Sequence, residues 1–220
     1  YRSYNCIYRI KIFFLMKAIF LNISAWIMLP FMDAIAKYLS SELPFFQITW
    51  ARYFFTVFIV LPLMFFFFKN QLKWSENPKL QFYRGLTLFF ANICFFYSIS
   101  IISMAKALTL AFVAPLITTT LSPFCLGEKV GAKRWSAVIV GFIGILVVIR
   151  PGLIEFNLAS FAAVGTGCFY GIYLIITRKL HSTDSPLLTL FLTGVVGAII
   201  GSFIVPVVWV NPTLIQWSWL

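Results

Sequence analysis

The chain has 220 residues, of which 61% are hydrophobic, 19% aromatic and only 10% charged. A soluble domain has about 25% charged residues, so this composition excludes an ordinary globular protein. The formal net charge of +11 does not indicate a nucleic-acid partner, because the basic residues cluster between apolar runs, as in membrane proteins. The sequence therefore predicts an all-α polytopic membrane protein that has the lipid bilayer as its solvent.

Seven apolar segments are predicted to cross the membrane, since a helix of about 20 residues spans a hydrocarbon core of ~30 Å. In chain order they cover about 17–39, 44–68, 80–102, 105–126, 135–149, 158–177 and 186–210. The fifth is predicted to end at Arg150-Pro151-Gly152, where proline and glycine stop a helix. The tail, Asn211–Leu220, is rich in tryptophan, which is typical of a membrane interface.

Lysine and arginine residues are distributed unevenly between alternate connections. Only Lys37, Arg52, Lys106 and Arg150 lie on one side, whereas all the others lie on the side of the N-terminus. The positive-inside rule therefore predicts a cytoplasmic N-terminus in a cell membrane, with the bacterial inner membrane as the expected location. Arg84, at the cytoplasmic end of the third span, is interpreted as one of these anchoring residues.

The segment Pro30–Tyr53 brings charged residues into an apolar environment. Asp33 is the one acidic residue that we place inside an apolar span, and Lys37 and Arg52 follow it closely. At a rise of 1.5 Å per residue, Asp33 lies about 9 Å and Arg52 about 12 Å from the outer ends of their helices, so their depths permit a pair. Lys37 follows Asp33 by four residues, which is the favourable order for an ion pair on a helix.

A charge within hydrocarbon persists where it is paired or functional. We therefore predict that Asp33, Lys37 and Arg52 bind the substrate at a positively charged rim, which suits a carboxylate or a phosphate. Protonation of Asp33 would couple transport to protons. The alternative is a structural ion pair, or basic side chains that extend toward the interface.

Five further polar residues at membrane depth or at a span end are predicted to bind substrate. They are Asn92, Tyr97, Lys106, Tyr170 and Tyr173. For the uncharged groups the alternative is a hydrogen bond to a neighbouring helix, and for Lys106 it is an anchor at the interface.

Other features of the sequence are interpreted as structural. Thr118–Thr120 are assigned to hydrogen bonds within or between helices, because threonine can bond its own backbone. Gly141 and Gly144 are predicted to form a small face for helix packing. The four cysteines show no metal or redox spacing, and His181 stands alone in a polar connection, so no metal site and no cofactor are expected.

An internal repeat is visible when the chain is compared with itself. Lys37 precedes Pro44 by seven positions, and Lys179 precedes Pro186 by the same number. Under this offset the sixth span corresponds to the first, and Arg52 falls on Gly194. The sixth span comes five spans after the first, which is an odd number, so the second copy enters the membrane from the opposite side. This is the inverted repeat of secondary transporters, with a binding site between the halves.

Several motifs resemble the EamA domain of the drug/metabolite transporter superfamily. They are Trp50-Ala51-Arg52-Tyr53, Arg84-Gly85, Ala105-Lys106-Ala107-Leu108, Pro115-Leu116, Leu126-Gly127-Glu128, Trp135, Gly141-Phe142-Ile143-Gly144-Ile145 and Arg150-Pro151-Gly152. Members of this family usually have ten transmembrane helices in two inverted five-helix repeats. The resemblance implies that residues 18–150 form a first EamA repeat and that residues 157–220 begin a second, incomplete one. It also implies transport by alternating access.

The function predicted from these observations is a secondary transporter for a small polar metabolite, such as an amino acid or a related compound. Two other classes of function are alternatives to a transporter. A membrane-embedded enzyme requires clustered His, Asp or Glu residues, and one His with one intramembrane acid does not provide them. A scaffold, or a fragment that needs a second chain to complete the fold, is the main alternative because the chain ends two helices into the second repeat. A homodimer remains open.

Overall fold

A computed structural model describes residues 2–67, 75–149, 157–181 and 183–220, and every regular element within these ranges is a helix. In chain order the elements are α1 (Arg2–Leu39), α2 (Phe45–Phe67), α3 (Pro78–Ile101), α4 (Met104–Ala111), α5 (Ala114–Leu126), α6 (Ala132–Ile149), α7 (Leu158–Leu180), α8 (Pro186–Ile204), the short 3₁₀ helix η2 (Val205–Val207) and α9 (Leu214–Trp219). The predicted all-α class is confirmed.

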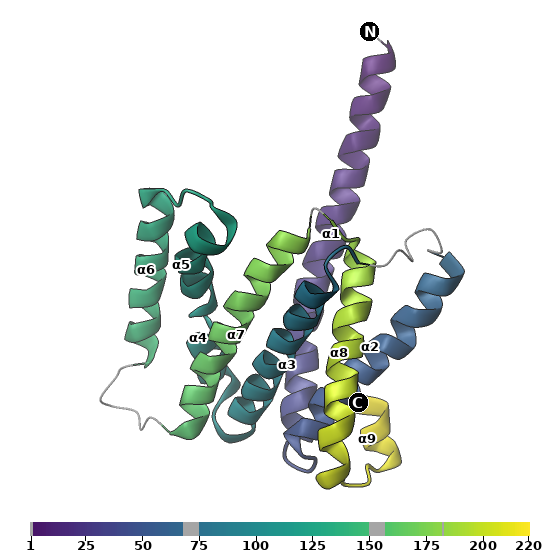
Figure 1. Cartoon of the computed structure of the whole chain (residues 1–220), viewed down its shortest axis with the longest axis vertical. Helices are drawn as coiled ribbons and strands as arrows, with labels where there is room; N and C mark the ends of the chain where they lie inside the picture. The colour runs from purple at the N-terminus through teal and green to yellow at the C-terminus, as the bar shows by residue number, and fades with distance from the viewer. Residues whose placement is uncertain (1, 68–74, 150–156, 182) are drawn as a thin grey trace.

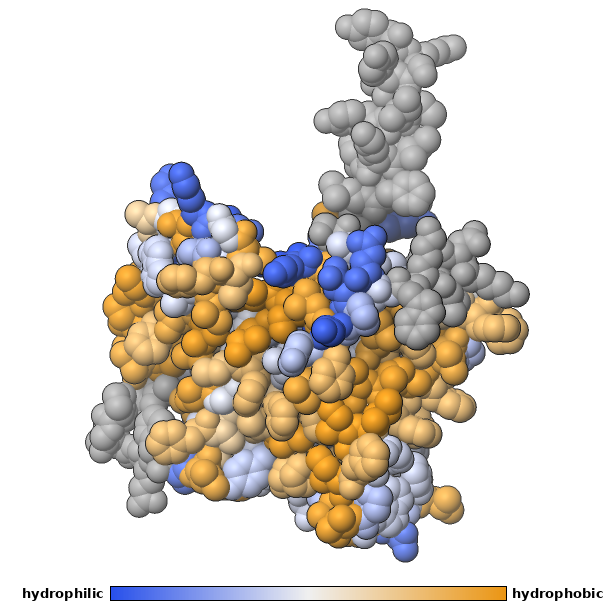
Figure 2. Space-filling view, viewed as in Figure 1, coloured by the Kyte–Doolittle hydropathy of each residue, from blue (hydrophilic) through white to orange (hydrophobic). Residues whose placement is uncertain are grey.

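Six stretches of the described helices are long and apolar enough to cross a membrane. They are Ile19–Leu39, Phe45–Phe66, Pro78–Ile101, Met104–Leu126, Leu158–Leu180 and Pro186–Val207. Helix α6 occupies the position of the remaining predicted span, 135–149. The predicted end of that span at Arg150-Pro151-Gly152 lies outside the described residues. Lys69 and Lys73, two of the basic residues assigned to the side of the N-terminus, also lie outside them. Figure 2 shows hydrophobic side chains across the middle of the molecule and hydrophilic ones toward its two ends. The chain is a multi-pass membrane protein.

The fourth predicted span is not one continuous helix, because it divides into α4 and α5 at Phe112 and Val113. Pro115 explains the break, since proline has no backbone N–H to donate to the carbonyl of Ala111 four residues earlier. This carbonyl instead faces helix α7: a Cβ atom added at Gly167 would lie 2.6 Å from the Ala111 oxygen. Thr118, in α5, donates to the carbonyls of Ala114 (2.9 Å) and Gly171 (3.3 Å), so its structural interpretation is confirmed.

The end of the chain differs from the sequence-based expectation. The last span was predicted to run to residue 210, but α8 ends at Ile204 and the chain turns through η2, which contains Pro206. The tail forms the short helix α9, in which Thr213 and Gln216 cap the first turn reciprocally. The side chain of Gln47 holds the preceding segment to α2 by donating to the carbonyl of Val210 (2.9 Å) and accepting from its N–H (3.1 Å).

Helix α7 lies between α3 on one side and the α4–α5 pair on the other, and α8 packs against both α2 and α3 (Figure 1). The α5–α6 and α7–α8 connections lie at one end of the bundle, whereas the α1–α2 and α3–α4 turns lie at the other. This alternation is the one expected of helices that cross a membrane in turn.

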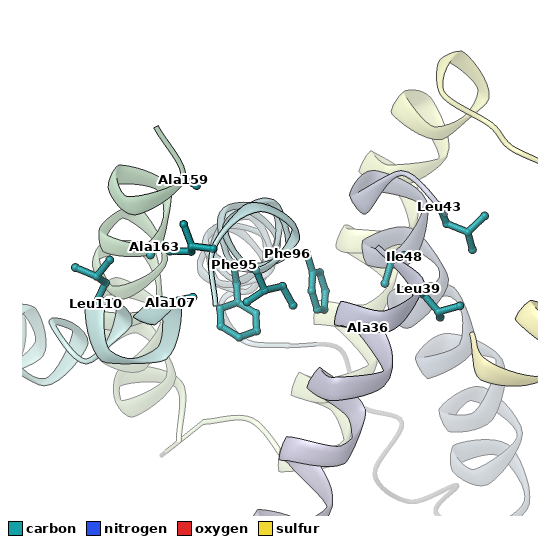
Figure 3. Close-up of a cluster of buried hydrophobic side chains, with 12 residues drawn as sticks. Ala36, Leu39, Leu43, Ile48, Phe95, Phe96, Ala107, Leu110, Ala159 and Ala163 are labelled. Atoms are coloured by element: carbon teal, nitrogen blue, oxygen red, sulfur yellow. The ribbon is translucent and has the colours of Figure 1, made fainter. Parts of the chain in front are cut away.

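The main apolar core joins helices that are far apart in sequence (Figure 3). Phe95 and Phe96 of α3 are its largest members, and Phe96 is only 1% exposed. On one side the cluster contains Ala36 and Leu39 of α1, and on the other it reaches small residues of α4 and α7, such as Ala163. The small residues allow these helices to approach closely where the two phenylalanines fill the centre.

The contact between α8 and α2 depends on three glycines of α8. A Cβ atom at Gly194 would lie 3.0 Å from Val57, and one at Gly201 would lie 2.8 Å from Trp50. At Gly197 an added Cβ would lie 2.5 Å from Cγ of Tyr53. The predicted packing face at Gly141 and Gly144 does not form within the described part of the chain, because a Cβ added at either position meets none of its atoms within 4 Å. The close helix contacts lie on α7 and α8 instead.

Replacing Gly197 by alanine is expected to destabilise the protein by about 1–3 kcal/mol, because the new methyl group overpacks against the buried ring of Tyr53. Thermal unfolding of the purified protein in detergent measures the effect. Gly144→Ala is the matched control: its methyl group meets open space, so the gain in helix propensity should leave the protein equally stable or more stable by ~0.5–1 kcal/mol. Equal destabilisation by the two substitutions would contradict the packing argument.

Candidate functional site

A cluster of polar side chains lies between α2 and α3, within otherwise apolar helices. The amide of Asn92 donates to the hydroxyl of Tyr53 at 2.6 Å, and Arg52 approaches the amide oxygen of Asn92 at 3.5 Å. The Arg52 guanidinium also lies 6.0 Å from the centre of the Phe96 ring. Two of the predicted site residues, Arg52 and Asn92, are therefore brought together.

Arg52 of α2 acts electrostatically on the carboxyl group of Asp33 in α1. Within the described part of the chain they form no salt bridge, since the two pairs within 4.0 Å join Glu128 to Arg134 (3.8 Å) and to Arg178 (3.7 Å). A groove of about 470 Å³ lies beside Arg52, lined by apolar residues of α1 and α2, by Phe96 and by the end of the chain at Trp219 and Leu220.

The expected pair between Asp33 and Lys37 does not form. The ammonium of Lys37 donates to the carbonyls of Ile99 (2.6 Å) and Ile102 (3.0 Å), at the end of α3. These carbonyls have no N–H partner further along the helix, and a cation at this end also complements the helix dipole. Lys37 therefore caps α3 in this structure.

Tyr97 and Lys106 lie away from the polar cluster. The ring of Tyr97 packs edge-on against Phe45, with 5.4 Å between the ring centres. The backbone N–H of Lys106 lies in the first turn of α4 and donates to the N-cap residue, Ser103, while its side chain is partly exposed. Tyr97 lies near the end of α3 and Lys106 near the start of α4, so both residues lie close to the α3–α4 turn.

Tyr170 and Tyr173 of α7 stack on one another, with 5.5 Å between their ring centres. Tyr170 lies within electrostatic range of Arg52, so the tyrosine pair lies near the Asn92 cluster. The hydroxyl of Tyr173 accepts a hydrogen bond from Arg84 at 2.7 Å. Stacked electron-rich rings form a surface that attracts aromatic groups and cations.

Arg84 is not the exposed anchor that the sequence indicates, because only 6% of its surface is exposed. Its guanidinium donates to the hydroxyl of Thr177 at 2.8 Å and to the carbonyl of Thr189 at 3.1 Å. A further hydrogen bond joins it to the Thr193 hydroxyl, and its Cζ atom lies 4.6 Å from the centre of the Tyr173 ring. The positive-inside pattern marks basic residues near helix ends but does not distinguish those that turn into the bundle.

The polar contacts continue from Arg84 to the α7–α8 connection. Gln81, one turn before Arg84 on α3, donates to the Thr189 hydroxyl (3.2 Å) and to the carboxylate of Asp184 (2.6 Å). Ser75 and the backbone N–H of Glu76 also donate to Asp184. Polar side chains therefore follow α3 from this connection to Asn92, deep in the apolar bundle.

Asp184 lies outside the membrane-spanning segments and is only 9% exposed. Burial raises the pKa of its carboxyl group, but hydrogen bonds from Ser75, Gln81, the Glu76 backbone and Thr183 outweigh this effect and hold the pKa below its usual value. The ionised carboxylate therefore fastens residues 75–76 to the connection between α7 and α8. The sequence does not indicate this contact, because acidic residues are common in polar connections and Asp184 lies in one.

The fold and the buried polar cluster define a multi-pass α-helical membrane protein with ionisable groups inside the bundle. The EamA-like transporter family matches the chain over residues 16–150, and the chain belongs to this family. This confirms the resemblance drawn from the motifs.

Several curated relatives carry transporter names. The chain is 31% identical to the S-adenosylmethionine uptake transporter of Rickettsia bellii over 84% of its own length and 63% of that protein. The protein of the same name from Rickettsia prowazekii is 30% identical over 88% of this chain and 67% of its own length. A riboflavin transporter of Vibrio cholerae is 41% identical over 37% of this chain and 27% of its own length. The chain thus spans about two thirds or less of these relatives. No solved structure matches it significantly.

Asp184→Asn is expected to lower the free energy of unfolding by about 1–3 kcal/mol at pH 7, because an amide cannot accept all the hydrogen bonds that the carboxylate receives. The folded-state pKa is lowered, so this stabilisation is complete above the unfolded pKa of about 3.9 and is lost as the pH falls through the folded value. Unfolding measured from pH 7 to pH 3 should show the two proteins converging in acid. Glu76→Gln, which leaves the Glu76 backbone donor in place, is the control; a constant difference at all pH values would contradict the role of the carboxylate.

Proposed function

We propose that the chain belongs to a secondary transporter that moves a small polar metabolite across the cell membrane by alternating access. The observation that carries the proposal is the cluster of Arg52, Asn92 and Tyr53 within apolar helices, next to Asp33 and the stacked pair Tyr170 and Tyr173. Ionisable residues at membrane depth are costly and mark the paths of substrates and ions.

The chemistry of the cluster suits a compound that carries both charges and an aromatic group. The arginine complements a carboxylate, Asp33 complements a cation, and the tyrosine pair offers faces to an aromatic ring or a sulfonium ion. S-adenosylmethionine, which names the Rickettsia relatives, has a carboxylate, an ammonium group, a sulfonium centre and adenine. It is therefore the first compound to test, followed by amino acids and riboflavin.

We assign the other predicted residues to the outer end of the path. Lys37 is proposed to set the position of the end of α3 through its two hydrogen bonds, so that Asn92 faces Arg52. Tyr97 and Lys106 are proposed to line the entrance near the α3–α4 turn. In this assignment the N-terminus is cytoplasmic, as the distribution of basic residues indicates.

We also propose that residues 18–150 form one EamA repeat and that residues 157–220 belong to a second, inverted one. The contact between α2 and α8 supports this arrangement. The two helices correspond under the sequence offset, and helices related by a two-fold axis contact each other only close to that axis. Gly194, which corresponds to Arg52, is where α8 admits Val57 of α2, so the second copy has a packing residue where the first has a charge.

Cells that express the protein are expected to accumulate labelled S-adenosylmethionine faster than cells with an empty vector. Arg52→Gln should reduce this uptake by about tenfold or more at equal expression, because the loss of a charge-assisted hydrogen bond in a desolvated site costs on the order of 1.5–3 kcal/mol. Lys133→Gln removes the same charge from an exposed position in α6 and should leave uptake unchanged.

No uptake of S-adenosylmethionine, amino acids or riboflavin by a well-expressed protein would overturn the proposal. It would instead favour a scaffold, or a chain that acts only with a second chain.

Asp33→Asn is expected to flatten the dependence of uptake on external pH between about pH 5 and pH 8, because the amide cannot exchange a proton. The measurement compares initial uptake rates of wild type and variant across this range. An unchanged pH profile at normal expression would exclude Asp33 as a proton-coupling group while leaving transport itself in place.

A further inference from the structure

We propose that Arg84 binds the carboxylate of the transported compound on the cytoplasmic side of the Asn92 cluster, in a site that is closed in this structure. The inference rests on the proposed transport function and adds a second anion-binding position to it. Arg84 belongs to one of the EamA-like motifs and is interpreted from the sequence as an anchor, but neither the sequence patterns nor the family match assigns it a role in binding.

The charge of Arg84 is not balanced by a carboxylate in the described part of the chain. All the hydrogen-bond partners of the Arg84 guanidinium are neutral oxygens, namely the hydroxyls of Tyr173, Thr177 and Thr193 and the carbonyl of Thr189. Among the described residues, no carboxylate lies within 4.0 Å of it. A buried cation is costly unless an anion compensates it. Arg84 therefore has no counter-ion among the described residues, and we expect a bound anion to supply one.

Arg52 and Arg84 differ in the charge of the groups that surround them. Arg52 acts electrostatically on the carboxyl group of Asp33, so an acid of this chain lies within its range. The electrostatic partners of Arg84 are the rings of Tyr53 and Tyr173, which are neutral at physiological pH. An incoming carboxylate would therefore stabilise the charge of Arg84 more than that of Arg52.

The groups around Arg84 have the geometry to bind a carboxylate. An arginine presents parallel N–H groups that match the two oxygens of a carboxylate. The hydroxyls that now accept from Arg84 can also donate, so they can turn toward the same carboxylate. Thr193 and Tyr173 belong to different helices, α8 and α7, and a carboxylate placed between them and α3 would receive donors from three helices.

Arg84 lies on the same helix as Asn92, nearer to the α7–α8 connection. It precedes Asn92 on α3 by eight residues, which is about 12 Å at 1.5 Å per residue. The hydroxyl of Tyr53 accepts a hydrogen bond from Asn92 and lies within electrostatic range of Arg84. The hydroxyl of Tyr173 accepts one from Arg84 itself, so tyrosines lie between the two arginines. Tyr170 and Tyr173 would hold the aromatic part of a substrate next to the carboxylate.

Arg84 is now closed off, because it is 6% exposed and α7 and α8 both contact α3 around it. Substrate reaches it only when these helices separate from α3. The site therefore belongs to a different conformation of the transport cycle from the Arg52 cluster.

The test compares S-adenosylmethionine with its decarboxylated form, which keeps the sulfonium, the amine and adenine but has no carboxylate. Titration calorimetry on the purified chain in lipid nanodiscs measures both affinities for wild type, Arg84→Gln and Tyr173→Phe. Wild type should prefer the carboxylated compound. Arg84→Gln should lose this preference, with affinity for the carboxylated compound falling on the order of 30-fold and little change for the other. Tyr173→Phe, which leaves the charge in place but removes one hydroxyl donor, should weaken the preference less than Arg84→Gln does.

Equal discrimination by wild type and Arg84→Gln would overturn the assignment, as would a wild type that binds both compounds equally. Uptake measured in parallel tests the transport proposal separately. If cells still take up S-adenosylmethionine while binding shows either of these two results, the role of Arg84 is wrong but the transport function is supported. If Arg84→Gln does not fold, Arg84→Lys decides. Its single-point charge should weaken binding of the carboxylated compound alone by about three- to tenfold, and equal weakening for both compounds would contradict the inference.

Discussion

The burial of the Arg84 guanidinium constrains how α3, α7 and α8 come together. Inside a membrane there is no water to satisfy five N–H donors, so the oxygen acceptors must come from neighbouring helices. Thr177 and Tyr173 supply them from α7, and Thr189 and Thr193 supply them from α8. The three helices are thereby fixed in rotation about their axes as well as in distance. The polar contacts that run toward Asp184 and toward Asn92 depend on this arrangement.

Close approach of the helices is made possible by residues without side chains. Gly197 admits the ring of Tyr53, which in turn places its hydroxyl on Asn92. Gly167 admits the carbonyl of Ala111, which is free because Pro115 cannot donate to it. In a membrane, where apolar packing against lipid and against protein are nearly equivalent, such contacts select one arrangement of helices over another. Packing and the position of the polar cluster therefore have a common origin.

The two intramembrane arginines stand in different electrostatic situations. Arg52 lies near Asp33, beside a groove between α1 and α2, whereas Arg84 is enclosed among neutral oxygens. A transport cycle that passes a carboxylate from one to the other would use this difference, since each position offers a charge while a different set of helices encloses it. The tyrosines between them provide hydroxyls and ring faces along the same line.

The sequence by itself determined the class of the protein, the approximate helices and the family, because apolar length, basic asymmetry and motif spacing are local properties of the chain. It also identified Arg52 and Asn92, since polar residues in an apolar run are conspicuous. It did not identify Arg84 or Asp184, because their positions near span ends fit an anchor and a loop equally well. Nor did it show that Lys37 caps α3 or that Gly141 and Gly144 contact no other helix that the structure describes. Only the tertiary structure decided these points, because the partner of a buried charge or a glycine comes from a helix distant in sequence, and no local pattern specifies which helix that is.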